Sequence, residues 1–348
     1  MQRAERITEF VETIWDWYSE NKRTLPWRDL QDVDPAERAY KVMVSEIMLQ
    51  QTQVSRVKIV FKDFLERFPS IQDLASASNK EILMAWRGMG YNGRALRLRD
   101  AARVIESSFA GLQVCSNLQQ TRKQANKKTV GFPSSMEELQ SIPGIGHYTA
   151  AAIRNFAFNI PTPCLDTNIR RILHRTFVGP ENPDGTWKKD DAYLLELAEE
   201  ILTVAIASPG AKRDAANWHA ALMDFGSIVQ TKTSPRWELC PLTAKEVMKT
   251  SPQAFTRVQN RKSQMANGKS FEPGRFVGAK YIPNRIFRGK VIEELRDAAE
   301  GLKLDVIGRR VCIEWSPVDH RAWLKGIVEK LVAERMITFS RGRYRLFE

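Results

Sequence analysis

Two carboxylic acids, Glu46 and Asp166, occupy sequence settings that would hold them in opposite protonation states. Glu46 lies in a helical pattern, and Val42, Met43 and Leu49 share its face. A glutamate on an apolar stripe is desolvated, which raises its pKa. We therefore expect Glu46 to be available as a proton donor. The alternative is a buried glutamate that is satisfied by a nearby arginine or backbone amide.

Asp166 has the opposite setting. It follows the segment PTPCL and precedes the apolar series Ile169, Ile172 and Leu173, so it falls at the N-terminus of a helix. The free amides of that helix end would keep its carboxylate ionised. Capping alone would explain an aspartate at this position. One protonated and one ionised carboxyl group is, however, the arrangement that cleavage of a glycosidic bond uses.

The segment IPGIGHYTA, residues 142–150, predicts a tight turn between two helices. Gly144 and Gly146 permit the turn and leave backbone N–H groups uncovered where the next helix begins at His147. Such an arrangement binds phosphate. An ordinary helix–helix turn is the alternative reading of these residues taken alone.

The charge of the chain favours a polyanionic partner. The net charge is +12, of which +9 falls on residues 251–348 and +4 on residues 107–132. Four scattered cysteines, with no CxxC pair, indicate a reduced intracellular setting. No apolar run is long enough to span a bilayer, and the N-terminus is typical of an amphipathic helix and not of a signal peptide.

Apolar spacing predicts a mainly α protein over residues 1–242, interrupted by a polar, basic insertion at about 107–132. Residues 243–283 are rich in polar and basic side chains and are expected to form a linker. Residues 284–348, called here the C-terminal module, predict two helices followed by a hairpin.

That order is typical of a small α+β, winged-helix-like module. Arg341, Arg343 and Arg345 recur every second residue in the final hairpin, so a strand would present all three on one face, against DNA phosphates. A small α+β cap with no binding role is the alternative. The basic residues of the insertion are further candidates for phosphate contacts: Arg122, Lys123, Lys127 and Lys128.

Several motifs occur together in one order: LPWR (25–28), SEIMLQQTQVSRV (45–57), GMGYNGRALRL (88–98), IPGIGHYTAAAI (142–153), LDTNIRRIL (165–173) and MDFGSIV (223–229). With this order and spacing the chain resembles the helix-hairpin-helix DNA glycosylases, most of all the MutY-type adenine DNA glycosylases. The resemblance covers about residues 7–242, and LQQTQV is its most specific part.

The resemblance implies roles for individual residues. Glu46 would protonate a ring nitrogen of adenine, and Asp166 would stabilise the cationic sugar that is left when the base departs. Other matching positions are Tyr148 and Asn168 in the catalytic site, Trp27, Arg28 and Asp224 in the base pocket, and Gln50, Gln51, Thr52, Met89, Tyr91, Gly144, Gly146 and His147 against DNA. Plain core packing is the alternative for Trp27.

Tyr148 bears on the reaction type. Endonuclease III relatives carry a lysine at this position, and its amine forms a Schiff base and cuts the strand. A phenol cannot form an iminium, and Arg170 is not a lysine either. We therefore expect a monofunctional glycosylase that leaves an abasic site. Double-stranded DNA would be its partner, and a monomeric, cytoplasmic, nucleoid-associated protein is expected.

The chain departs from the family pattern at two places. A family [4Fe–4S] cluster needs four cysteines, but only Cys240 aligns, while Gln230, Trp237 and Glu246 hold the other positions; we therefore expect no iron–sulfur cluster and no metal. The C-terminal module does not resemble the domain with which MutY-type enzymes recognise oxidised guanine. Two alternatives therefore stay open: a thymine or uracil glycosylase acting opposite guanine, and a non-catalytic DNA-binding protein. Because Glu46 and Asp166 precede residue 243, removal of the C-terminal module is expected to leave base release intact.

Overall fold

The structure is a computed structural model that describes residues 1–28, 30, 34–109, 131–182, 184, 186–210, 212–256 and 272–348. The chain divides into two compact units. Unit 1 comprises Met1–Met43, Phe132–Ser141 and Ile145–Lys269, and unit 2 comprises Val44–Gly131, Ile142–Gly144 and Ser270–Glu348. The four basic residues expected to contact phosphates from the insertion, at positions 122, 123, 127 and 128, lie outside the described residues.

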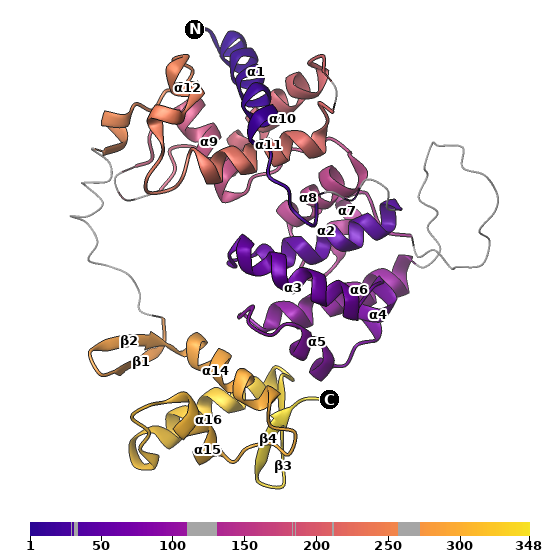
Figure 1. The fold of residues 1–348 in the computed structure, drawn as a ribbon, viewed down its shortest axis with the longest axis vertical. Helices are drawn as coiled ribbons and strands as arrows, with labels where there is room; N and C mark the ends of the chain where they lie inside the picture. The colour runs from indigo at the N-terminus through magenta and orange to yellow at the C-terminus, as the bar shows by residue number, and fades with distance from the viewer. Residues whose placement is uncertain are drawn as a thin grey trace, which may run out of the picture. The chain divides into compact units, whose positions relative to one another are not determined.

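The regular secondary structure of unit 1 is helical within its described residues (Figure 1). Its elements are α1 (Arg3–Asn21), the larger part of α2 (Pro35–Leu49), α7 (Met136–Ser141), α8 (His147–Phe158), α9 (Thr167–Leu173), a π-helical turn η1 (His174–Val178), α10 (Asp191–Ala207), α11 (Ala215–Ile228), the short η2 (Trp237–Leu239) and α12 (Pro241–Ala244). Aromatic rings fill the core: Phe10 packs edge-on against Phe177 at 5.3 Å between centroids, and Trp15 lies 5.3 Å from Trp218.

Helix α11 is central to unit 1, since it packs against α1, α8 and α9. Its approach to α9 depends on Gly226. A Cβ atom at that position would lie 2.6 Å from Cβ of Asn168, which is closer than two carbon atoms can approach. The glycine of the MDFG motif therefore brings the first turn of α9, and with it Asp166, against α11.

The first part of unit 2 is a second helical cluster, which follows the end of α2. It contains α3 (Val54–Arg67), α4 (Ile71–Ser76), α5 (Asn79–Ala85) and α6 (Gly93–Phe109). Ser70 and Ser78 start α4 and α5 with capping boxes, which fix where these two short helices begin. Trp86 is fully buried after α5, and its ring lies 6.0 Å from that of Phe64.

The second part of unit 2 is α+β. It contains an antiparallel pair β1 (Gly274–Val277) and β2 (Lys280–Pro283), then α14 (Asn284–Arg296), α15 (Leu304–Val311) and α16 (Pro317–Ala333), and finally the antiparallel pair β3 (Ile337–Ser340) and β4 (Arg343–Leu346). Gly274 pairs with Pro283, and Ile337 pairs with Leu346. The predicted fold class, mainly α with a small C-terminal α+β part, is confirmed.

Three details differ from the sequence expectations. The β1–β2 pair lies inside the range expected to be a linker. Helix α15 was missed because it is only two turns long and contains Gly308; the Trp315 ring occupies the place of a side chain there, 2.4 Å from a Cβ atom built on that glycine. Arg341 is not in a strand: it forms the β3–β4 turn with Gly342, at φ values of 52° and 75°. The outer face of β4 therefore carries only Arg343 and Arg345.

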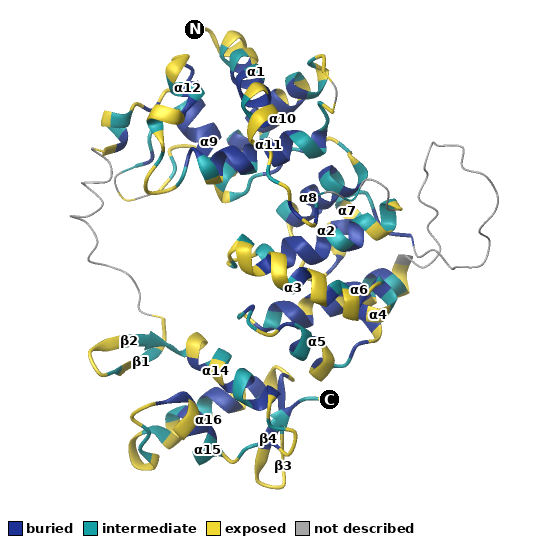
Figure 2. Ribbon diagram, in the orientation of Figure 1, coloured by how far each residue is buried: buried dark blue, intermediate teal, exposed yellow. Residues whose placement is uncertain are grey.

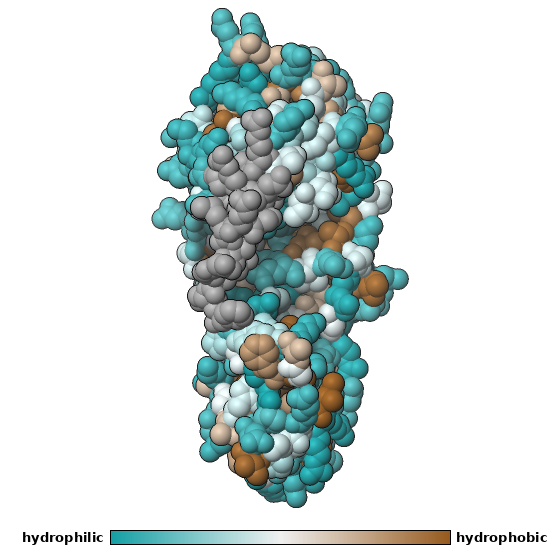
Figure 3. All heavy atoms as spheres, turned by 90° about the vertical axis from the view of Figure 1, so that its left-hand side faces the viewer, coloured by the Kyte–Doolittle hydropathy of each residue, from teal (hydrophilic) through white to brown (hydrophobic). Residues whose placement is uncertain are grey.

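Figure 2 colours the ribbon by burial, and dark-blue, buried positions occur along the helices of both units. Hydrophilic side chains predominate on the face drawn in Figure 3, and apolar ones are scattered among them. Within the described ranges, no helix combines the length and the apolar character that a membrane span requires.

Candidate active site

The helix-hairpin-helix turn lies where the sequence predicts it. Helix α7 ends at Ser141, α8 begins at His147, and Gly146 caps α8 with extended backbone. Gly144 has a φ of 91°, which a side chain would disfavour. The space around the missing side chain of Gly146 is open, so the amides at the start of α8 are accessible to an anion.

Asp166 is the N-cap of α9, as predicted. Its carboxylate accepts hydrogen bonds from the backbone N–H groups of Asn168 at 2.9 Å and Ile169 at 2.6 Å. The side-chain amide of Asn168 donates a third hydrogen bond at 2.8 Å. All three bonds favour the ionised form of the carboxylate.

Burial acts against these bonds, an effect that the expectation of an ionised carboxylate did not include. Desolvation raises the pKa of Asp166 above its usual range, while the hydrogen bonds from Ile169 and Asn168 and the charge of Arg171 lower it. The carboxylate is therefore held in place by donors in a half-buried setting. A positive charge placed beside it would be attracted more strongly than in bulk water.

Arg171 links the start of α9 to the C-terminal end of α11. Its guanidinium donates to the side-chain oxygen of Asn168 at 2.6 Å and to the carbonyls of Gly226 at 2.8 Å and Gln230 at 2.6 Å. Burial lowers the pKa of Arg171 to about 10. The network fixes the amide of Asn168, which in turn orients the carboxylate of Asp166.

The base-pocket candidates Trp27, Arg28 and Asp224 are brought together in unit 1. Trp27 and Arg28 line a cleft of about 340 Å³. Asp224 is fully buried and accepts hydrogen bonds from the Arg28 guanidinium at 2.8 Å and from the Arg23 guanidinium at 2.7 Å. Asp224 therefore acts on the cleft through Arg28, whose position it fixes.

Glu46 lies near the end of α2, in the part of that helix that belongs to unit 2. Its side chain is 7% exposed, and Val42 and Met43 on the same face are buried, as the apolar stripe predicts. Tyr148, in the first turn of α8, is half-buried and packs against the core of unit 1.

Two loops of unit 2 carry most of the remaining DNA-contact candidates. The α2–α3 loop (residues 50–53) contains Gln50, Gln51 and Thr52, and the α5–α6 loop (residues 86–92) contains Met89 and Tyr91. Gln51 and Tyr91 both adopt positive φ, at 56° and 45°. Gln51 is exposed and Tyr91 is 46% exposed, whereas Met89 is buried.

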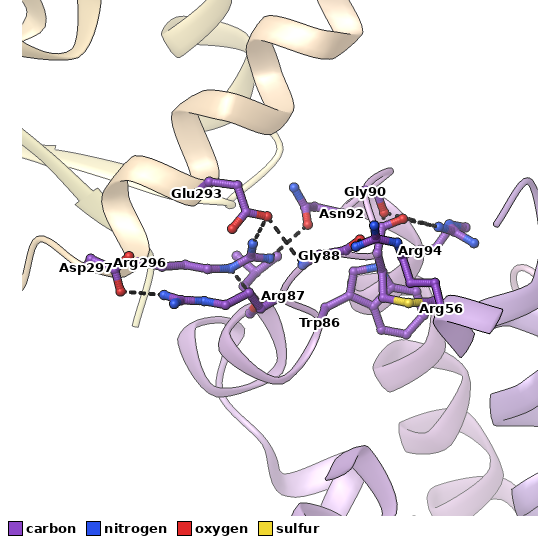
Figure 4. A network of polar contacts seen from close by, with 12 residues as sticks. Arg56, Trp86, Arg87, Gly88, Gly90, Asn92, Arg94, Glu293, Arg296 and Asp297 are labelled. Atoms are coloured by element: carbon purple, nitrogen blue, oxygen red, sulfur yellow. Dashed lines mark hydrogen bonds and ion pairs between the residues drawn. The ribbon is translucent and has the colours of Figure 1, made fainter. Parts of the chain in front are cut away.

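Arg94 joins these two loops, and Figure 4 shows it beside Gly90. Its guanidinium donates to the carbonyls of Met89 and Gly90, each at 3.1 Å, to the Thr52 hydroxyl at 3.0 Å, and also to the Gln50 carbonyl. It is 3% exposed, and desolvation lowers its pKa to about 10. Neither Arg94 nor Arg171 can be recognised from the sequence, because an arginine in a helical pattern carries no sign that it is buried.

The residues at the expected cluster position do not fit an iron–sulfur cluster. Cys240 Sγ lies 3.3 Å from the Gln230 side-chain nitrogen and 3.7 Å from Met248 Sδ. No group of three or more His, Cys, Asp or Glu side chains suited to a metal occurs among the described residues. Trp237 packs edge-on against Phe255 at 5.7 Å. One thiol among amide and thioether groups cannot replace four cysteines; the absence of iron itself stays a prediction.

Comparison with known proteins identifies the class. Residues 44–197 match the HhH-GPD superfamily of base excision DNA repair proteins. The chain is 32% identical over 300 residues to the adenine DNA glycosylase of Mycolicibacterium smegmatis, and the alignment covers 84% of each protein. The chain therefore belongs to the HhH-GPD superfamily and is homologous to adenine DNA glycosylases.

Other relatives match over a smaller share of their length. Identity is 34% to the adenine DNA glycosylase of Mus musculus and 35% to that of Homo sapiens, over 68% of this chain. These alignments span 41% and 38% of the two mammalian proteins. The chain thus spans about two fifths of the mammalian enzymes it matches.

Solved structures confirm the fold. A thermostable thymine-DNA glycosylase superposes with a TM-score of 0.56 at 24% identity, over 73% of this chain and 98% of that one. Endonuclease III in a non-covalent complex with DNA superposes with a TM-score of 0.51 at 17% identity, over 74% of this chain and 100% of that one. The helix-hairpin-helix glycosylase fold is therefore shown.

Proposed function

We propose that the protein is a monofunctional DNA glycosylase that removes adenine mispaired with guanine or 8-oxoguanine. The observation that carries this proposal is the alignment with the Mycolicibacterium smegmatis adenine DNA glycosylase, which extends over 84% of both proteins. The setting of Asp166 supports it: the half-buried carboxylate is oriented by three donors, which suits the stabilisation of a cationic sugar.

Glu46 is the proposed general acid. Its proton passes to a ring nitrogen of the extruded adenine, and the bond between that base and C1′ of the sugar breaks with its electron pair moving to the base. The sugar is left with oxocarbenium character, and the Asp166 carboxylate stabilises that charge. Water then adds to C1′ and loses a proton, which gives an abasic site.

Tyr148 limits the reaction to hydrolysis. A tyrosine has no amine with which to attack C1′, so no Schiff base forms and the DNA strand stays intact. Its proposed role is to position the nucleotide. The cleft lined by Trp27 and Arg28 is the proposed base pocket, with Asp224 holding the guanidinium of Arg28.

The amides at the start of α8 and the exposed residues Gly144, Gly146 and His147 are the proposed phosphate contacts of the hairpin. Gln50, Gln51, Thr52, Met89 and Tyr91 are proposed to fill the space left in the duplex when the base is extruded. Tyr91 is the largest exposed side chain of this set.

One experiment tests the proposal and its rivals together. Duplexes that carry A:G, A:8-oxoguanine, T:G or U:G pairs are incubated with the protein, and abasic sites are detected by alkaline strand cleavage. We expect adenine release from the first two duplexes, with strand breaks only after alkali. Release of thymine or uracil alone would reassign the substrate, and strong binding with no release from any duplex would favour a non-catalytic DNA-binding protein.

A further inference from the structure

The α5–α6 loop has a backbone that needs support. Gly88, Gly90 and Tyr91 all lie in the left-handed region, at φ values of 78°, 65° and 45°. Tyrosine seldom adopts this conformation, so the loop relies on contacts from its surroundings. On one side these are the Arg94 network, a hydrogen bond from Arg56 to the Gly88 carbonyl at 2.9 Å, and one from the Trp86 indole to the Gly90 carbonyl.

The C-terminal module supplies the contacts on the other side (Figure 4). Arg296, at the end of α14, donates to the carbonyl of Leu83 at 3.0 Å and to the side-chain oxygen of Asn92 at 3.1 Å. Its side chain is 0% exposed, and Glu293 on the same helix neutralises its charge. Asn92 is itself buried and follows Tyr91 directly.

Further contacts extend this attachment beyond a single arginine. Arg87 in the loop forms an ion pair with Asp297 at the end of α14. The Asn79 side chain, at the start of α5, donates to the carbonyl of Arg335 after α16. Met336 fills the space beside Gly93, where a Cβ atom would lie 3.4 Å from its terminal methyl group. The module is therefore anchored to both ends of the loop.

The anchored loop and the module also share a cleft of about 370 Å³. The exposed residues of its lining include Tyr91, the cations Arg97, Arg285 and Lys290, and one acid, Glu334, and the apolar side chains of Met89 and Met336 also line it. A net positive lining beside an exposed tyrosine suits a surface that faces a nucleic acid. The contact between module and loop thus lies beside the side chain proposed to enter the duplex.

We propose that Arg296 is a positioning residue of the reaction: through Asn92 it holds Tyr91 in the conformation that extrudes the target base. The inference rests on the proposed function. It gives the C-terminal module a part in base release, in contrast to the sequence expectation that the module can be removed without effect on that step. A C-terminal module that only added affinity for DNA would not need a buried arginine directed at the α5–α6 loop.

The test compares three variants in single-turnover base release at saturating protein. Arg296→Met removes the donors and keeps an unbranched side chain, Asn92→Ala removes the acceptor without altering the module, and Asn92→Asp keeps an acceptor for the arginine. Arg310→Met is the matched control, because Arg310 forms an exposed ion pair with Glu294 elsewhere in the module. Base extrusion is followed by fluorescence of 2-aminopurine beside the target adenine.

We expect Arg296→Met and Asn92→Ala to slow base release by about tenfold and to reduce the fluorescence change in proportion, because small displacements of positioning groups are costly. Asn92→Asp and Arg310→Met should stay near the wild type, and DNA affinity should change less than the rate. Thermal melting shows whether each variant is folded. If Arg296→Met is not folded, the base-release rate of Asn92→Ala decides the test.

Wild-type rates in folded Asn92→Ala would overturn the inference, as would equal losses in Arg310→Met. Failure of the proposed function looks different, since the wild-type protein would then release no base from any duplex.

Discussion

Arginines of the two units bind different kinds of partner. In unit 1, Arg28 and the half-buried Arg23 meet the carboxylate of Asp224, and Arg171 supports the amide that orients Asp166. In unit 2, the hydrogen bonds of Arg94 go to backbone carbonyls and one hydroxyl. Arg28 in unit 1 thus fixes a charged group, while Arg94 in unit 2 fixes the backbone of two loops.

This difference indicates that the two sets of contacts serve different purposes. A carboxylate held by arginines or by helix amides supplies an electrostatic field, which suits the stabilisation of a cationic sugar. An arginine that bridges carbonyls of two loops keeps their backbones in a single arrangement, which suits insertion into DNA. Replacement of residues in the two units should therefore affect different steps.

The largest effect is expected from Asp166→Asn in unit 1. The amide can still cap α9, but it cannot stabilise positive charge at the sugar. Base release should fall on the order of 10³-fold, while affinity for the duplex stays within a few-fold. Single-turnover kinetics and fluorescence anisotropy measure the two quantities. Near wild-type turnover would show that Asp166 is only a cap.

The corresponding change in unit 2, Arg94→Met, should act on stability and on the loops. It leaves several buried carbonyls without a donor, each costing about 1 kcal/mol or more, so the free energy of unfolding should fall by roughly 2–4 kcal/mol. Urea unfolding measures that fall. If the variant loses no stability, the carbonyls find other donors and Arg94 does not organise the loops.

Low pH should destabilise the fold through unit 1, because unit 1 contains a buried histidine. His219 on α11 is 2% exposed, with Nδ1 2.8 Å from the Ala215 carbonyl, and burial lowers its pKa to about 4. The unfolded chain binds this proton at higher pH, with a pKa of about 6.5. The free energy of unfolding should therefore decrease by roughly 3 kcal/mol as the pH falls from about 6.5 to about 4.

His219→Gln is the matched variant for this prediction, because a glutamine can also donate to the carbonyl but cannot take up a proton. Its unfolding free energy should depend less on pH over this interval than that of the wild type. Identical pH dependence, measured by urea unfolding at several pH values, would show that other groups in the chain control acid stability.

Much of the fold and part of the site could be predicted from sequence, because they depend on local patterns. The turn at Gly144, the cap at Asp166 and the apolar face of Glu46 are each determined by neighbours a few residues away. The Arg94 and Arg296 networks could not be predicted, since their acceptors lie in loops or on other helices and the arginines resemble surface residues in sequence.

The smallest expected effect concerns the arginines of the β3–β4 hairpin. Arg341 and Arg343 are exposed, while Arg345 is half-buried and Arg343 donates to the Gly301 carbonyl at 3.0 Å. If this hairpin lies on DNA, the slope of log affinity against log salt should fall by roughly 0.9 for each phosphate contact that is lost. Because phosphate contacts carry no sequence information, the loss should be equal on matched and mismatched duplexes.

Single alanine variants test the hairpin, with Arg309→Ala on α15 as a control for charge alone. Arg341→Ala should lower the salt slope the most, since this residue is exposed in the β3–β4 turn. Arg345→Ala should lower it the least, because its side chain is partly covered. Base release at saturating protein should be unchanged in the alanine variants of Arg341, Arg343 and Arg345. Arg296→Met in the same module should differ, because it slows base release. An unchanged slope in Arg341→Ala would mean that the module contacts DNA through the Tyr91 side and not through its hairpin.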